Sequence, residues 1–312
     1  MQWYTELALL LFFTGAGFFF AMAETELLTL GKWRLRQVTT VNPARGAFIR
    51  KLQSAPQDLL ATITLGNTLA HAAIIATALL MGVAAVSVAA FAVLAAWLRV
   101  VPPIAGFAVF GLALLGGGVT SLFLGLASIF VPGAAEHVSR RAGMLAVVIG
   151  LGSLLLLGTL VRRASGVPAI HDITTETTDP PLFSAAAMNP ANRGRDLSYP
   201  HGPAETPRLQ EQAYADLQPI ELRVGPDDAY QEALNTASDL GWVVVESNST
   251  TRTFEAEDET SVFRFVDDIV VRVRPGSAGS VIDVRSTSRT GVGDMGVNAD
   301  RIRRFRSALS SR

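Results

Sequence analysis

The sequence predicts a multi-pass α-helical membrane region followed by a small α+β domain, an antiparallel sheet with two flanking helices. Only 17% of the 312 residues are charged and the mean hydropathy is +0.35, which is too apolar for an ordinary soluble chain. The apolar residues are also concentrated in the first half, where four long stretches carry no charge: 7–23, 59–98, 100–135 and 142–161. Charges return after residue 161, so the membrane region is expected at 1–163.

These stretches predict about five membrane spans. A spanning helix needs roughly 20 apolar residues, and the second stretch is long enough for two spans with a tight turn near Gly82. Four spans is the alternative, if the segment after Gly82 is only re-entrant. The first stretch has no basic segment before it, so we expect a retained span and not a cleaved signal peptide. The five expected spans are 4–28, 59–81, 83–99, 104–131 and 142–161.

A basic amphipathic link at 31–57 sets the orientation. Loops rich in Lys and Arg lie on the cytoplasmic side, so the amino terminus is expected outside. With five spans the tail is cytoplasmic, which we favour, and with four it lies on the other side. Lysine occurs only at Lys32 and Lys51 whereas arginine is plentiful. This bias, together with the abundant alanine, suggests a bacterial protein of the cytoplasmic (inner) membrane.

The tail differs from the membrane region in charge. Residues 166–312 contain 15 arginines and no lysine against 22 acidic residues, a formal net charge of −7. An acidic tail argues against nucleic-acid binding, which requires a basic face. The chain has no cysteine, which excludes disulfides, thiolate metal sites and a cysteine nucleophile. The expected partners are the lipid bilayer and, through the membrane helices, further copies of the chain.

The tail is expected to divide into an extended arm at 164–222 and a compact α+β core at 223–312. The arm is rich in Pro, Gly and Asn, which favour turns and loops. In the core, PDDAYQEALNTASDLG predicts a helix that stops at Gly241, and WVVVES and RTFEAE predict paired strands. The alternating apolar residues of DIVVRVRPGSAGSVIDVRS predict a hairpin. NADRIRRFRSAL predicts a last helix that Asn298 caps.

The segments FFAMAETELLTLGKWRLRQ and NPARGAFIRKLQSAPQDLLATITLGNTLAHAA resemble the start of the CNNM/CorC transmembrane domain, domain-of-unknown-function family 21. The resemblance covers about residues 1–80, so it is incomplete. It implies a link to the transport of magnesium and other divalent cations. The residues that carry it are Ala23, Glu24 and Thr25 at the end of the first helix, and Leu65, Gly66 and Asn67 in the second.

A second resemblance covers the tail, about residues 165–312. PAIHDITTETTDPPLF, QEQAYADLQPI, DDIVVRVRP and DVRSTSRTGVGDMGVNADRIRRF resemble domain-of-unknown-function family 1499, and these motifs occur in the family's order. The resemblance implies that the arm and the core form one domain. Because this family has no established biochemistry, it implies no activity.

One candidate site lies in the membrane region. Thr64, Asn67, Thr68 and His71 recur at helical spacing and form a polar face on the second span. With a carboxylate from the end of the first span, such an oxygen-rich cluster suits a hard cation such as Mg²⁺. The alternative is that the glutamates are interfacial and the polar side chains bond between helices. The candidate cation-binding residues are Glu24, Thr25, Asn67 and His71, with Glu24 and Asn67 as metal ligands.

The tail contains a second polar cluster, which either binds a ligand or is structural. Its members are Asp172, Asp179, Asp283, Arg285, Arg289, Asp294 and Asn298. Asp267 and Asp268 are adjacent and point to opposite faces if they lie in a strand. Cross-strand ion pairs on a solvated sheet face are expected for the charged residues of the hairpin. No nucleophile–base pairing is recognisable, so no catalytic residue is predicted.

The glycine-rich RTGVGDMGVN contains a G-x-G-x-x-G pattern at 291–296. The pattern follows a predicted strand and precedes a helix, but no repeated βαβ units surround it, which argues against a dinucleotide site. Anion binding at the amino terminus of the helix remains an alternative.

The leading hypothesis is a non-enzymatic, membrane-anchored binding or regulatory module linked to divalent-cation (Mg/Co) homeostasis. The first alternative is a divalent-cation transporter that uses the first two spans. The second is an enzyme that uses carboxylates of the tail, for which Asp172, Asp267 and Asp294 have to converge. No cofactor other than Mg²⁺ is suggested by the sequence.

Overall fold

The structure, a computed structural model, describes residues 15, 19, 22, 32–130, 136–200 and 205–311. Its contacts divide the chain into two compact units. One comprises Met1–Phe91 and Val109–Leu157, and the other comprises Ala92–Ala108 and Gly158–Arg312. The second unit therefore combines the tail with the connection between two long helices. Most of the predicted first span at 4–28 lies outside the described residues.

The predicted basic link forms two short helices, α2 (Lys32–Val41) and α3 (Pro43–Gln53). The Oδ1 atom of Asn42 accepts a hydrogen bond from the backbone N–H of Arg45 at 3.0 Å and so caps α3. The guanidinium of Arg50 donates to the Thr39 hydroxyl at 3.2 Å. This bond joins the two helices of the link.

Helix α4 (Pro56–Trp97) is one continuous helix of 42 residues. The predicted separation into spans at 59–81 and 83–99, with a turn near Gly82, is wrong. A single glycine costs a helix only about 1 kcal/mol, so a long apolar helix continues through it. Gly82 serves close packing instead, because a Cβ atom there would lie 2.6 Å from the Ser121 hydroxyl of the next helix.

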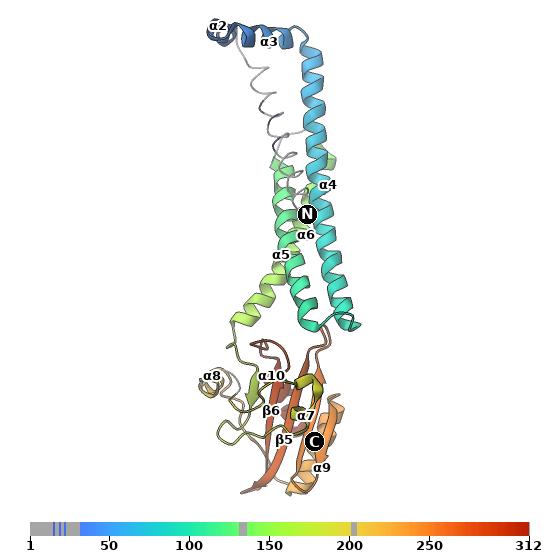
Figure 1. Ribbon diagram of the computed structural model, residues 1–312, viewed down its shortest axis with the longest axis vertical. Helices are drawn as coiled ribbons and strands as arrows, with labels where there is room; N and C mark the ends of the chain where they lie inside the picture. The colour runs from blue at the N-terminus through green and yellow to red at the C-terminus, as the bar shows by residue number, and fades with distance from the viewer. Residues whose placement is uncertain are drawn as a thin grey trace. The chain divides into compact units, whose positions relative to one another are not determined.

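The other long helices are α5 (Pro103–Phe130) and α6 (Glu136–Ser165), which correspond to the predicted spans at 104–131 and 142–161. They approach each other at small residues, as membrane helices commonly do. A Cβ atom on Gly150 would lie 2.6 Å from the backbone nitrogen of Leu122, and the Ser121 hydroxyl donates to the Ala146 carbonyl at 2.9 Å. Within the described residues, α4, α5 and α6 are the three helices long and apolar enough to cross a membrane (Figure 1).

The tail is built on an antiparallel sheet in the order β1-β6-β5-β4-β3, in which β2 also pairs with β6. The register of the central hairpin pairs Val271 with Val284 and Val273 with Ile282, so the apolar residues of both strands share one face. The predicted α+β fold is thus confirmed. The strands are β1 (Asp172–Thr174), β2 (Ile220–Leu222), β3 (Val243–Asn248), β4 (Thr253–Glu259), β5 (Val266–Gly276) and β6 (Gly279–Ser288).

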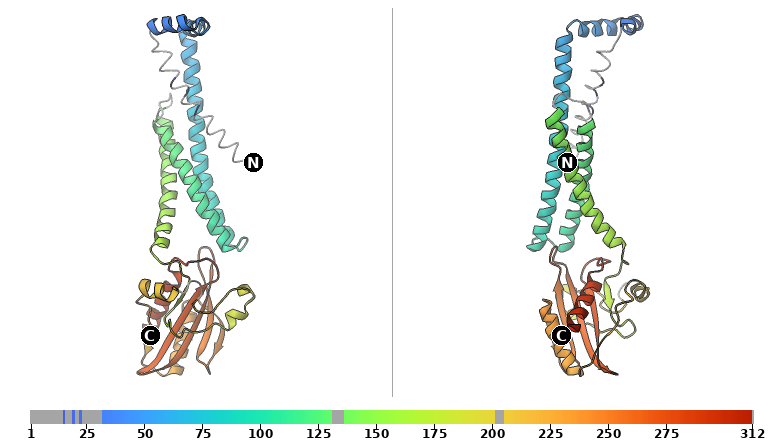
Figure 2. Two further views of the ribbon diagram at one scale, coloured as in Figure 1. Left: turned by 60° about the vertical axis from the view of Figure 1, so that its left-hand side comes forward. Right: turned by 180° about the vertical axis from the view of Figure 1, so that it is seen from behind.

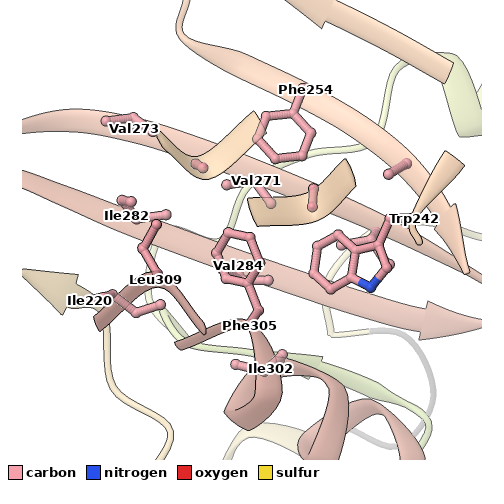
Figure 3. Packing of buried hydrophobic residues seen from close by; sticks show 14 of the residues in the cluster. Ile220, Trp242, Phe254, Val271, Val273, Ile282, Val284, Ile302, Phe305 and Leu309 are labelled. Carbon is pink, nitrogen blue, oxygen red and sulfur yellow. The ribbon is translucent and has the colours of Figure 1, made fainter. Parts of the chain in front are cut away.

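Two helices, α9 (Pro226–Asp239) and α10 (Val297–Ser310), pack on the apolar face of this sheet. Figure 2 shows α10 in dark red alongside the strands. Ile302 and Phe305 of α10 are fully buried, and the Phe305 ring stacks on Trp242 with 5.0 Å between centroids (Figure 3). The period of about 3.6 residues that the sequence shows in this helix therefore marks its core-facing side.

The segment predicted as an extended arm is part of the same sheet domain. Strand β1 pairs Asp172 with Thr287 of β6, and β2 pairs Ile220 with Ile282 of the same strand. Between them lie α7 (Ala185–Met188), the 3₁₀ turn η1 (Pro190–Asn192) and α8 (Thr206–Ala213). The predicted boundary at 222 therefore separates strands of one sheet. Strands of three residues are too short for their alternation to be recognised in the sequence.

Candidate functional site

The sheet face opposite α9 and α10 is charged and largely covered. Successive side chains of a strand point to opposite faces, which places Glu255, Glu257, Asp268, Arg272, Arg274, Asp283 and Arg285 together. The predicted ion pairing on this face is confirmed, but the prediction of a solvated face is wrong. Asp283 and Arg285 are both 0% exposed, because residues 176–200 fold over them.

Asp172 and Arg285 form the most deeply buried ion pair of this face. The Arg285 guanidinium donates to both oxygens of Asp172, at 2.9 and 2.7 Å, and its remaining N–H groups reach the carbonyls of Pro181, Leu197 and Ser198. The rings of Phe183 and Tyr199 lie within 5.3 Å of the guanidinium carbon. All of these groups serve to satisfy one buried charge, which indicates a structural role.

Asp283 organises a second group on the same face. Its carboxylate accepts hydrogen bonds from Arg272 at 2.9 Å and from Arg274 at 2.7 Å. Asp179 is exposed and pairs with Arg272 at 3.1 Å. The structure therefore brings Asp179 and Asp283 of the predicted cluster together through one arginine.

Asp267 and Asp268 point to opposite faces, as predicted. Asp268 accepts hydrogen bonds from Arg289 at 2.6 Å and Arg195 at 3.1 Å on the charged face. Asp267 accepts one from Arg301 of α10 at 2.6 Å on the helix face. Burial raises the pKa of Asp267 above its usual range, and the Arg301 charge opposes this shift.

The remaining predicted residues, Asp294 and Asn298, lie at the start of α10. The Asp294 carboxylate accepts hydrogen bonds from the backbone N–H groups of Gly296 and Asn298, at 2.9 and 2.7 Å. The protein's own carboxylate thus occupies the position that an anion would take at a helix amino terminus. This arrangement argues against a phosphate or dinucleotide at the glycine-rich pattern.

A pocket of about 120 Å³ opens beside this helix start, within the second unit. Its apolar walls come from Ile104 and Phe107 of α5, from Phe265 before β5, and from Met295 and Val297 around the start of α10. An apolar concavity with a few convergent polar groups is the usual form of a small-molecule site. The polar residues of the lining are Thr260, Asp267, Ser288, Thr290 and Asp294.

The loops around this pocket hold strained backbone. Arg264 has φ of +63° and Met295 has φ of +54°, in the left-handed region that residues other than glycine rarely adopt. Arg99, in the connection between α4 and α5, has φ of +59° and donates to Glu259 at the end of β4 at 3.1 Å. The fourth such residue, Arg252, lies in the turn between β3 and β4 at the other end of the sheet. Such outliers often occur at functional sites, and three of the four in the described residues surround this pocket, which supports it as the candidate site.

The three carboxylates that the enzyme hypothesis requires do not all meet. Asp267 and Asp294 line the same pocket, whereas Asp172 binds Arg285 on the other face of the sheet. Each carboxylate of the pocket is held in place, Asp267 by an arginine and Asp294 by backbone amides.

The candidate cation site in the membrane region is described only in part. Glu24 and Thr25 lie outside the described residues. Asn67 and His71 are buried on one face of α4, each 5% exposed, and Thr68 donates to the Thr64 carbonyl of its own helix at 2.8 Å. Among the described residues there is no group of three or more His, Asp or Glu side chains that suits a metal ion.

Comparison with protein families agrees with the two resemblances. Residues 7–157 match the cyclin M transmembrane N-terminal domain, CNNM. Residues 172–309 match DUF1499, a protein family of unknown function. The CNNM match continues past residue 80, the limit that the motifs predicted, and reaches into α6. No curated protein matches the chain. The chain is thus a membrane protein in which a region similar to CNNM, called the CNNM region below, precedes a region similar to DUF1499, called the DUF1499 region.

Sequence reasoning did not find the aromatic wall of the pocket. Phe107 lies in the CNNM region and its ring contacts Phe263 and Phe265 of the DUF1499 region, with centroids 5.3 and 6.2 Å apart. In the sequence, Phe107 is one of many apolar residues in a span. The FRF motif at 263–265 is the one signal available, because two phenylalanines around an arginine are unusual in a polar loop.

Proposed function

We propose that the chain is a membrane-anchored binding module. A small ligand binds in the pocket beside the start of α10, called the DUF1499 pocket below, and controls the arrangement of the membrane helices. The wall of the pocket carries this proposal, because Ile104 and Phe107 of α5 line it together with Phe265 and Met295. A ligand there contacts a membrane helix and the sheet domain at once. Its binding therefore favours the arrangement in which these parts pack together.

The contacts around the pocket offer a route by which ligand binding acts on the connection between α4 and α5. Arg264 lies over the Trp97 ring at 5.8 Å and pairs with Glu259 at 3.0 Å. Glu259 also receives Arg99. These cation–π and ionic contacts are partly or fully solvent-exposed and individually weak. Ligand binding with a free energy of a few kcal/mol is therefore large enough to shift them.

Span parity supports an extracytoplasmic position for this module. Three helices, α4, α5 and α6, separate the basic link from the tail. An odd number of crossings leaves the two on opposite sides, and the basic link is expected inside. The cytoplasmic tail favoured from the sequence required a turn near Gly82, and α4 continues through this residue.

The role we propose is binding and not catalysis. The two carboxylates of the pocket have fixed structural partners, an arrangement that orients a ligand without providing a base for a nucleophile. The CNNM match supports a link between the controlled process and divalent-cation handling.

Filling the pocket is expected to abolish ligand binding. Thr290 lines the pocket and is exposed, so Thr290→Trp places an indole in its mouth. In a thermal-shift screen of small amphiphiles on the full chain in lipid nanodiscs, a ligand at about 100 times its Kd should stabilise the wild type by about 2.7 kcal/mol. The Thr290→Trp variant should show no shift.

Val292→Trp is the matched control, because Val292 lies in the same loop, is 81% exposed and does not line the pocket. It should respond like the wild type. A ligand that stabilises wild type and Thr290→Trp equally would show that this pocket is not the site.

Transport of a divalent cation is the second candidate function. It is favoured by the burial of Asn67 and His71, which lie one helical turn apart on α4, since polar groups inside a membrane are costly and usually functional. Glu24 would complete such a site in the hypothesis from the sequence.

If the chain transports, proteoliposomes should take up Co²⁺, and Glu24→Gln or Asn67→Ala should reduce the initial rate by at least about tenfold, a loss that even an outer-shell partner of a metal gives. Thr62→Ala is the control, because Thr62 is exposed on the same helix. Absence of uptake by the wild type, or full activity in Asn67→Ala, would exclude this candidate.

A further inference from the structure

We propose that the ligand of the DUF1499 pocket is a short alkylammonium, a primary amine cation on an apolar body of about four to six carbons. This inference rests on the proposed function and assigns the chemical class of its ligand. The residues that line the pocket are of two kinds: apolar side chains, and the acidic residues Asp267 and Asp294, which we call the acidic floor.

The acidic floor follows from the charges around Arg301. One guanidinium, that of Arg301, pairs with two carboxylates, Asp258 at 2.7 Å and Asp267 at 2.6 Å. Asp294 adds a third carboxylate, which accepts hydrogen bonds from the backbone N–H groups of Gly296 and Asn298. The start of α10 contributes about half a positive charge, so three carboxylates face one guanidinium and one helix start.

Carboxylates with this environment retain acceptor capacity. An ionised carboxylate offers about four lone-pair sites, and the hydrogen bonds of Asp294 use two of them. A primary ammonium has three N–H donors, which suits a site where Asp267 and Asp294 line one cavity. Charge-assisted hydrogen bonds of this kind are the strong ones.

Other ligand classes fit less well. An anion meets the two carboxylates and finds the helix start already occupied by Asp294. A divalent metal needs more ligands than the pocket supplies, and no group of three or more metal-binding side chains exists within the described ranges 32–130, 136–200 and 205–311. The remaining distinction is between a cationic and a neutral amphiphile.

The size of the cavity sets the length of the apolar body. At about 120 Å³ it is slightly smaller than the cavity of about 150 Å³ that holds benzene in an engineered protein core. Phe107 and Phe265 form one wall, and the Ile104 side chain another. A butyl chain therefore fits, with its ammonium at the carboxylates.

The test compares n-butylammonium, n-butanol and butyrate by calorimetric titration of the full chain in lipid nanodiscs. We expect butylammonium to bind at least about tenfold more tightly than the other two, as the strength of a charged hydrogen bond requires. Asp294→Asn should remove this preference, because its amide oxygen can keep one of the two backbone hydrogen bonds of Asp294 while the side chain carries no charge. Asp228→Asn, at an exposed position of α9, should leave it intact.

The unfolding temperature without ligand shows whether Asp294→Asn is folded, and Thr290→Trp should bind none of the three compounds. Equal binding of butylammonium and butanol, or an unchanged preference in a folded Asp294→Asn protein, would overturn the assigned ligand class and leave the proposed function standing. If none of the three probes binds, but other compounds bind the wild type and not Thr290→Trp, the ligand class is likewise overturned and the proposed function stands. Absence of any ligand in both experiments would overturn the proposed function as well.

Discussion

Asp172→Ala is expected to lower the free energy of unfolding of the DUF1499 region by about 3–5 kcal/mol, the usual cost of leaving one partner of a buried ion pair alone. Arg285 is fully buried on the charged face, and alanine removes both oxygens of its bidentate partner. The backbone carbonyls that remain around it carry only partial charge. Urea titration of the full chain in nanodiscs, with pulse proteolysis to measure the folded fraction of the tail, gives the value.

Two further variants separate charge from packing. Asp227 pairs with Arg252, and its side chain is 80% exposed. Asp227→Ala should therefore lower the free energy of unfolding by at most about 1 kcal/mol. Asp172→Leu combined with Arg285→Met should be less destabilised than Asp172→Ala, because apolar residues often replace a buried pair at little cost. If Asp172→Ala costs no more than Asp227→Ala, the charged face is not buried in solution.

Phe305→Ala should destabilise the same region by about 3–5 kcal/mol. Phe305 is fully buried, and its ring stacks on Trp242 at the centre of the core (Figure 3). Alanine removes the ring, so its contact with Trp242 is lost and a cavity is left between α10 and the sheet. The same urea titration measures this loss.

Val292→Ala is the matched comparison, since Val292 is 81% exposed and surface changes usually remain within about 0.5 kcal/mol. The loss in free energy of unfolding for Phe305→Leu should fall between those of Phe305→Ala and Val292→Ala, because leucine keeps part of the buried volume. A loss below about 1 kcal/mol for Phe305→Ala would mean that α10 does not pack on the sheet as described.

The sequence predicted the hairpin of β5 and β6 and the last helix because their signals are local. The alternation from Ile269 to Val273 is read within one strand, and the apolar stripe of Ile302, Phe305 and Leu309 within one helix. The ion pairs of Asp283 with Arg272 and Arg274 follow from the same register. Each prediction needed only neighbouring residues and the period of the element.

The covering of the charged face was beyond such reasoning. Asp172 lies 113 residues before Arg285, and nothing in either local pattern says that they meet. The strand that holds Asp172 is three residues long. Charged residues in an alternating strand are normally solvated, and a segment that folds over them becomes visible only in three dimensions.

The turn expected near Gly82 failed for a different reason. Helix length is not encoded by the local apolar pattern, so a stretch of 40 uncharged residues reads equally well as one long helix or two short ones. The contact with Ser121 that explains this glycine comes from another helix. The pocket was also unpredictable, because its walls at Phe107 and Phe265 are 158 positions apart in the sequence.

We propose that the binding module and the basic link lie on opposite sides of the membrane, and cysteine labelling measures the side on which each lies. The chain has no cysteine, so Val292→Cys and Val41→Cys, at positions 81% and 87% exposed, each give a single reactive site. With a membrane-impermeant maleimide on intact bacterial spheroplasts, we expect labelling of Val292→Cys at once and of Val41→Cys only after permeabilisation. Labelling of Val41→Cys in intact spheroplasts, or protection of Val292→Cys until they are opened, would contradict the account.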